Sequence, residues 1–106
     1  MLQASDLKGI VPPATTPLTD NDTVDREGVA RLMDWYIDAG CVGIFAIGSS
    51  GEGPCLTREM RYEMVDACAD ALGGRVPLLA GVSSPSFKES LMQAEEVAEL
   101  GADAIV

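Results

Sequence analysis

Residues 42–52 read VGIFAIGSSGE, an apolar run that passes directly into a loop of glycines and serines. The run does not alternate between apolar and polar residues, as a strand of a half-exposed sheet would. Strands covered on both faces have this continuous apolar pattern, and parallel sheets are built from them. We therefore predict a buried parallel strand over Val42–Ile47, with a loop of small, hydroxyl-bearing residues at its carboxyl end.

Three further apolar runs are spread along the chain. They are 9–14 (GIVPPA), 76–81 (VPLLAG) and 102–106 (ADAIV), and the last is cut off by the carboxyl terminus. Proline cannot donate to a strand ladder, so Pro12 and Pro13 confine the regular part of the first strand to its start or mark it as bulged. The four runs together predict four strands, the last of them unfinished.

Amphipathic segments separate these runs and carry helix start and stop signals. The first has Asp22, Thr23 or Asp25 available as its N-cap, and Gly40 stops it. Its apolar residues recur at helical spacing. They are Val29, Leu32, Met33, Tyr36 and Ile37.

The second and third segments also carry capping residues at both ends. Thr57 caps the second and Gly73–Gly74 ends it, while Ser86 caps the third and Gly101 ends it. Glu89 lies three residues after Ser86, the spacing of a capping box. The residues expected to face the core are Met60, Met64, Val65, Cys68 and Leu72 in the second segment, and Leu91, Ala94, Val97 and Ala98 in the third.

Short buried strands that alternate with helices are typical of repeated βα units, so the predicted class is α/β. A complete eight-stranded α/β barrel needs about 250 residues. The 106 residues therefore hold one domain at most and cannot form a whole barrel. Residues 1–106 thus hold four predicted strands, the last of them unfinished, and three predicted helices.

Composition excludes several classes of function. The chain carries 17 acidic and 7 basic residues, for a net charge of −10, and it lacks histidine. Phosphate backbones and anionic membrane surfaces repel such a surface, so we expect neither nucleic-acid nor membrane binding. The three cysteines are scattered and form no C-x-x-C pair, which favours free thiols and a cytoplasmic protein. No signal peptide is visible at the amino terminus.

In parallel βα folds, sites form in the loops that follow the carboxyl ends of the strands. Three such loops are complete: 15–17 (TTP), 48–52 (GSSGE) and 82–85 (VSSP). The middle loop has the strongest signal, because its glycines let backbone N–H groups converge beside the Ser49 and Ser50 hydroxyls. Such a loop suits a carboxylate or phosphate, although a plain turn with solvated serines is the alternative. Glu52 would repel an anion, so we expect it to point away and to hydrogen-bond backbone groups.

The segments 14–18 (ATTPL), 48–52 (GSSGE) with 56–59 (LTRE) downstream, and 76–82 (VPLLAGV) occur in an order that resembles one known family. This is the dihydrodipicolinate synthase/N-acetylneuraminate lyase family, pyruvate-dependent class I aldolases built on a (β/α)₈ barrel. The resemblance covers essentially all 106 residues. It implies that residues 1–106 are roughly the first four strands and three helices of such a barrel, ending inside the fourth strand. It implies a lyase that condenses a 2-keto acid with an aldehyde, or cleaves the product.

The resemblance also implies roles for individual residues. Ser49 and Ser50 would hold the carboxylate of pyruvate, and Ser49 would also take part in catalysis through a proton relay. Members often carry Thr-Thr or Ser-Thr here, so the Ser-Ser pair leaves the exact substrate open. The family's Schiff-base lysine lies on the sixth strand and its acid/base tyrosine on the fifth, both outside this sequence. Neither Lys8 nor Lys88 matches that lysine, so we expect the 106-residue chain alone to be inactive.

Further expectations follow from the same resemblance. They are a homo-oligomer, either a dimer or a tetramer, that uses no cofactor and no metal. Two alternatives from other classes stay open on the residues alone. One is a flavodoxin-like module that binds a phosphate or nucleotide at the loop 48–53, and the other is a fragment without catalytic activity.

Overall fold

A computed structural model describes all residues from Met1 to Val106. The chain alternates helices with short strands in the order expected for βα units. The elements are η1 (Ala4–Leu7), α1 (Arg26–Asp38), β1 (Ile44–Ala46), η2 (Gly53–Cys55), α2 (Arg58–Leu72), β2 (Leu78–Ala80), α3 (Phe87–Glu99) and β3 (Ala104–Ile105). The predicted α/β class is confirmed. No helix is both long enough and apolar enough to cross a membrane.

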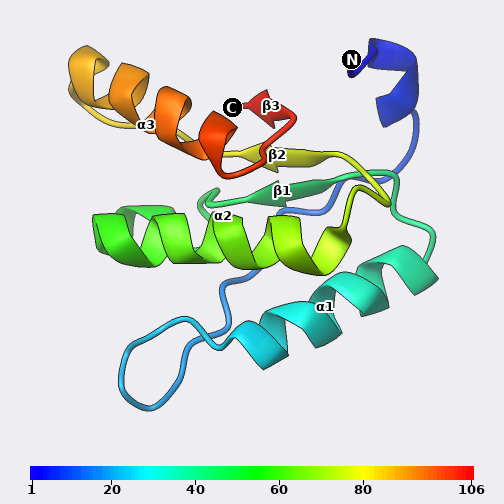
Figure 1. Cartoon of the computed structure of the whole chain (residues 1–106), viewed down its shortest axis with the longest axis horizontal. Helices are drawn as coiled ribbons and strands as arrows, with labels where there is room; N and C mark the ends of the chain where they lie inside the picture. Colours follow the sequence, from blue (N-terminus) through cyan, green and yellow to red (C-terminus); the bar gives the residue numbers. More distant parts are fainter.

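The three strands form one parallel sheet in the order β1-β2-β3. Ile44 pairs with Leu78 and Ala46 with Ala80, while Leu79 pairs with Ala104 on the other side of β2. Figure 1 shows the helices following one another across the molecule in the same order as the strands. Each βα unit therefore adds one strand and one helix in the same direction, as in the wall of a barrel.

The first apolar run forms no regular strand. It lies parallel to β1 but keeps only an isolated bridge between Pro13 and Phe45. The Phe45 N–H donates to the Pro12 carbonyl, and the Ala14 N–H donates to the Phe45 carbonyl. Neither proline has an N–H to offer, so the ladder cannot be continuous. The structure thus holds three strands and one irregular segment where four strands were expected.

The helix ends follow the local sequence. Asp25 accepts from the Gly28 N–H, Thr57 from the Met60 N–H and Ser86 from the Glu89 N–H. Gly73 adopts a left-handed conformation at the end of α2, as a C-cap glycine should. The predicted capping box at α3 is formed only by half, because Glu89 does not return a side-chain hydrogen bond to Ser86.

The core lies where α1 and α2 cover one face of β1 and β2. Ile44, Ala46, Leu78 and Ala80 are almost completely buried on this face. The core contains 17 residues and includes Val29 and Met33 from α1 and Met64, Val65, Cys68 and Leu72 from α2, as expected. Since strand residues alternate between faces, Phe45 and Leu79 turn to the opposite face, where they are half-buried.

The predicted inward face of α3 is partly wrong. Val97 is buried and Ala94 is half-buried, but Leu91 is 51% exposed and Ala98 is also exposed. The residue that turns inward beside Val97 is Gln93, which is only 3% exposed. The apolar face of α3 is therefore wider than the surface of α2 and the sheet against which it packs, and its outer residues stay exposed.

Candidate active site

The candidate site lies at the carboxyl end of β1, where the loop 48–52 begins. Because β1 and β2 are parallel, the loop that follows β2 emerges at the same edge of the sheet. Ser49 from the first loop and Ser83 from the second line one cavity of about 150 Å³. The sequence placed both loops at this edge, and the structure brings Ser49 and Ser83 to one cavity.

The serine loop folds as a tight helix-like turn. The Gly48 carbonyl accepts from the N–H groups of Gly51 and Gly53, and the Ser49 carbonyl accepts from the Glu52 N–H. The N–H groups of Gly48, Ser49 and Ser50 donate no hydrogen bond within the chain. Both serines are exposed. The loop therefore presents unpaired backbone donors next to two hydroxyls, a combination that suits an anionic oxygen.

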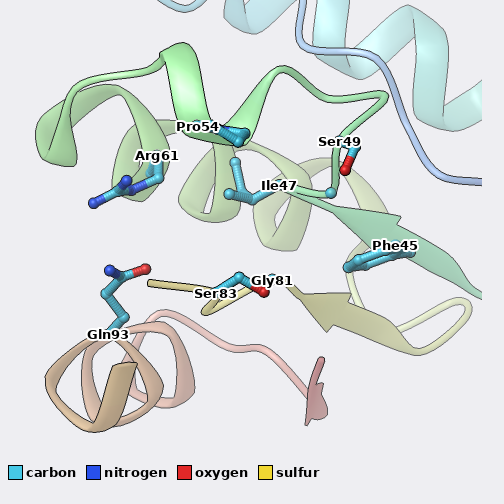
Figure 2. A pocket seen from close by; sticks show the side chains of 10 residues that line it. Phe45, Ile47, Ser49, Pro54, Arg61, Gly81, Ser83 and Gln93 are labelled. Atoms are coloured by element: carbon cyan, nitrogen blue, oxygen red, sulfur yellow. The ribbon is translucent and has the colours of Figure 1, made fainter. Parts of the chain in front are cut away.

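Figure 2 shows how side chains from helices, from β1 and from the loops after β1 and β2 surround the cavity. Ser49 lies at the end of β1, with the Phe45 ring nearby and the Ile47 side chain pointing inward. Arg61 from α2 and Gln93 from α3 face each other at the far end. Ser50, the next residue, is exposed and is not among the residues that line this cavity.

Arg61 and Gln93 were not singled out by the sequence analysis. Arg61 forms no salt bridge, and its Nε is buried without a hydrogen-bond partner. Arg58, one turn earlier, is instead neutralised by Glu96, which raises the pKa of its guanidinium. A positive charge lining the cavity favours anions near it. In the sequence, Arg61 lies one turn into the helix that follows the serine loop. This spacing alone does not predict a role for Arg61, because the cavity exists only in the folded chain.

The loop 15–17 contributes in a different way from the serines. Thr16 is 6% exposed, and its Oγ1 donates to the Gly51 carbonyl at 2.6 Å. Its neighbour Thr15 is exposed. Thr16 thus stabilises the end of the serine loop, and its hydroxyl already donates its hydrogen bond to the Gly51 carbonyl.

Glu52 is exposed and does not line the cavity, so it points away as expected. Its carboxylate forms no hydrogen bond with the backbone, and that part of the expectation is wrong. The residue adopts a left-handed conformation at the start of η2. Exposure lets water solvate the carboxylate, so no protein partner is needed.

The remaining reactive groups lie outside the cavity. All three cysteines are free thiols. Burial raises the pKa of Cys68 to about 12, which makes its thiol a poor nucleophile. Lys8 and Lys88 are both exposed, and neither lines the cavity. No group of three or more His, Cys, Asp or Glu side chains is placed to hold a metal ion.

Comparison with known proteins assigns the fold. The model of the dihydrodipicolinate synthetase family matches residues 6–106, nearly the whole chain. The structure superposes on dihydrodipicolinate synthase from Bacteroides thetaiotaomicron with a TM-score of 0.88 and 39% identity, covering 93% of this chain and 33% of that one. The three strands and their helices therefore correspond to βα units of a (β/α)₈ barrel, and the chain belongs to the dihydrodipicolinate synthetase family.

Two other relatives are similarly close. An uncharacterised DapA-like lyase of Halobacterium salinarum is 39% identical over 100 residues, which are 94% of this chain and 33% of the relative. YagE, an E. coli K12 prophage protein of the dihydrodipicolinic acid synthase family solved in complex with pyruvate, is 35% identical with a TM-score of 0.87. The match covers 92% of this chain and 33% of YagE. The chain thus spans about a third of the length of these relatives, and the similarities favour a barrel lyase over a flavodoxin-like module.

Proposed function

We propose that this chain is the keto-acid-binding third of a Schiff-base lyase, in which Ser49 and Ser50 bind the carboxylate of pyruvate or a related 2-keto acid. The observation that carries the proposal is the serine turn at the carboxyl end of β1. It offers the Ser49 and Ser50 hydroxyls together with backbone N–H groups that have no other partner. The relative YagE, solved with pyruvate, supports the choice of ligand.

The proposed chemistry needs a lysine that this chain does not supply. The amine of that lysine condenses with the keto group of the substrate, and water leaves as the imine forms. Loss of a proton from the adjacent carbon gives an enamine, which attacks an aldehyde to form the new carbon–carbon bond. The reverse sequence cleaves the same bond. Lys8 and Lys88 are exposed and do not line the cavity, which supports a reactive amine outside residues 1–106.

The serines would act on the part of the substrate that does not react. Hydrogen bonds to the carboxylate orient the keto carbon toward the amine, and this orientation lowers the entropic cost of imine formation. We propose that Ser49, which also lines the cavity, passes a proton between the substrate and the acid/base tyrosine that the family resemblance implies. We further propose that the whole enzyme acts as a homo-oligomer in the cytoplasm and uses neither a metal nor an organic cofactor.

Borohydride trapping tests this function. Borohydride reduces an imine to a stable amine, so pyruvate should become covalently attached to one lysine of the complete enzyme. Peptide mass spectrometry should place the adduct outside residues 1–106, and the isolated chain should remain unmodified. A specific adduct on Lys8 or Lys88 would overturn the assignment of the missing amine. A complete enzyme that traps no pyruvate, with the aldehyde present or absent, would overturn the function itself.

A further inference from the structure

The residue directly before the serine turn has a strained backbone. Ile47 has a φ angle of +63°, in the left-handed region that β-branched residues rarely enter. Two other non-glycine residues, Asp22 and Glu52, also have positive φ, but both are exposed. Ile47 is only 8% exposed. A strained conformation of this kind persists only where the surrounding structure enforces it, and such residues gather at functional sites.

Two glycines from different parts of the chain leave the space that this conformation needs. The left-handed turn directs the Ile47 carbonyl oxygen at the backbone of Gly53 and Gly81. A Cβ atom would lie 2.8 Å from this oxygen at Gly53 and 2.3 Å at Gly81, so neither position can hold a side chain without movement. The Ile47 side chain is held in turn against the cavity that Ser49 lines (Figure 2).

The left-handed residue determines where the next residues go. An extended residue at 47 would continue β1, whereas positive φ turns the chain back toward α2. The turn lets the Gly48 carbonyl accept from Gly51 and Gly53, which leaves the Ser49 and Ser50 N–H groups without partners. The Ile47 N–H and C=O themselves form no backbone hydrogen bond. The conformation is therefore held by packing, and its effect falls on the serine turn.

We propose that Ile47 is a positioning residue, whose left-handed backbone aims the Ser49 and Ser50 hydroxyls and amides at the carboxylate of the keto acid. This inference rests on the proposed function. It assigns the positioning to the backbone angle of Ile47 and not to its side chain. A substitution that allows positive φ should therefore disturb keto-acid binding less than a substitution that forbids it.

Ile47→Pro and Ile47→Gly in the complete enzyme separate these cases. Proline fixes φ near −65°, and no backbone hydrogen bond is lost because the Ile47 N–H donates none. Its neighbour Ala46 is already in a strand, which proline permits. We expect Ile47→Pro to raise KM for the keto acid by roughly tenfold or more with a smaller change in kcat, since contacts to the carboxylate serve ground state and transition state alike. We expect Ile47→Gly, which can keep positive φ, to raise KM much less than Ile47→Pro does.

A stability comparison keeps the test decisive if Ile47→Pro fails to fold. Glycine tolerates positive φ and alanine does not, so Ile47→Gly should melt at a higher temperature than Ile47→Ala. The control pair is Arg31→Gly and Arg31→Ala, at an exposed position of α1. There Arg31→Ala should melt at the higher temperature, because alanine is the better helix former. An alanine variant at 47 that is more stable than the glycine variant would overturn the inference, as would an unchanged KM in a folded Ile47→Pro enzyme. A wild-type enzyme that borohydride and pyruvate do not modify would instead overturn the proposed function, and this inference with it.

Discussion

The hydroxyl of Thr16 donates a buried 2.6 Å hydrogen bond to the carbonyl oxygen of Gly51, 35 residues further along the chain. This bond joins the loop after the first apolar segment to the end of the serine turn. Gly51 leaves little room there, since a Cβ at this position would lie 2.8 Å from the Ala14 carbonyl oxygen. The first and second βα units are thus tied together at the point where the candidate site begins.

Thr16→Val should destabilise the chain. Valine keeps the shape of threonine but leaves the buried Gly51 carbonyl without its donor, a loss of roughly 1–3 kcal/mol. Urea unfolding followed by circular dichroism measures this loss. Thr15→Val is the matched control, and because Thr15 is exposed it should change stability by no more than about 0.5 kcal/mol. Equal losses in the two variants would show that the Thr16 hydrogen bond contributes nothing.

Ser50→Ala in the complete enzyme should weaken keto-acid binding. A hydrogen bond to a charged carboxylate contributes roughly 1.5–3 kcal/mol, which corresponds to a loss of about 10- to 150-fold. Ser49→Ala should lower kcat more than it raises KM if its hydroxyl relays a proton. Both serines are exposed, so circular dichroism should stay native in both variants. Normal binding and turnover in both would mean that the loop is only a turn.

Cys68 should make the stability of the chain fall at high pH. Burial raises the pKa of this thiol from an ordinary 9.0 to about 12, so its neutral form is favoured in the folded state. The contribution is complete below about pH 8.5 and is lost progressively as pH rises toward 12, because the unfolded thiol ionises first. The urea midpoint should therefore decline less steeply above pH 9 in Cys68→Ala than in the wild type.

Cys55→Ala is the control for this prediction, because Cys55 is exposed. Its midpoint should decline with pH as steeply as that of the wild type. Tyr36, whose pKa is also raised by burial, is present in every variant and adds the same slope to each. Thiol labelling at pH 8 gives an independent check, since Cys55 should react quickly and Cys68 only on unfolding. Rapid labelling of Cys68 in the folded chain would contradict its burial.

The isolated chain should self-associate despite its charge of −10. Phe87 and Leu91, one turn apart on α3, are 78% and 51% exposed, and Ile105 on the edge strand β3 is 53% exposed. Exposed apolar side chains beside an unpaired strand edge favour association between copies. Light scattering should therefore report a mass above 11.1 kDa for the wild-type chain.

The double variant Phe87→Glu, Leu91→Glu should move the measured mass toward the monomer. Trp35→Glu is the control, because Trp35 is 65% exposed on α1, and α1 lies on the opposite side of the view from α3 and β3 (Figure 1). A monodisperse wild-type monomer with a sharp, cooperative melt would refute the prediction. It would also show that the charge outweighs the apolar face of α3.

Local sequence determined the helices and the order of the βα units. Asp25, Thr57 and Ser86 cap the three helices because each side chain reaches an N–H three residues away, whatever the rest of the fold does. The run 44–46 became a strand in which Ile44 and Ala46 are buried, because all three of its residues are apolar. The position of Ser49 and Ser50 after that strand followed from the same pattern, as did the resemblance to the family.

Tertiary structure alone decided the features that depend on distant residues. Nothing in the local sequence around Ile47 favours positive φ, and the angle is set by the space that Gly53 and Gly81 leave for its carbonyl. The prolines of the first apolar run already predicted an irregular strand, and tertiary structure decided only that Pro13 lies opposite Phe45. Leu91 has the right spacing for the core but is exposed, because burial depends on which surface packs against a helix and not on its own pattern. Caps and periodicity act within one turn of the chain, whereas strain, cavities and burial arise only where distant segments meet.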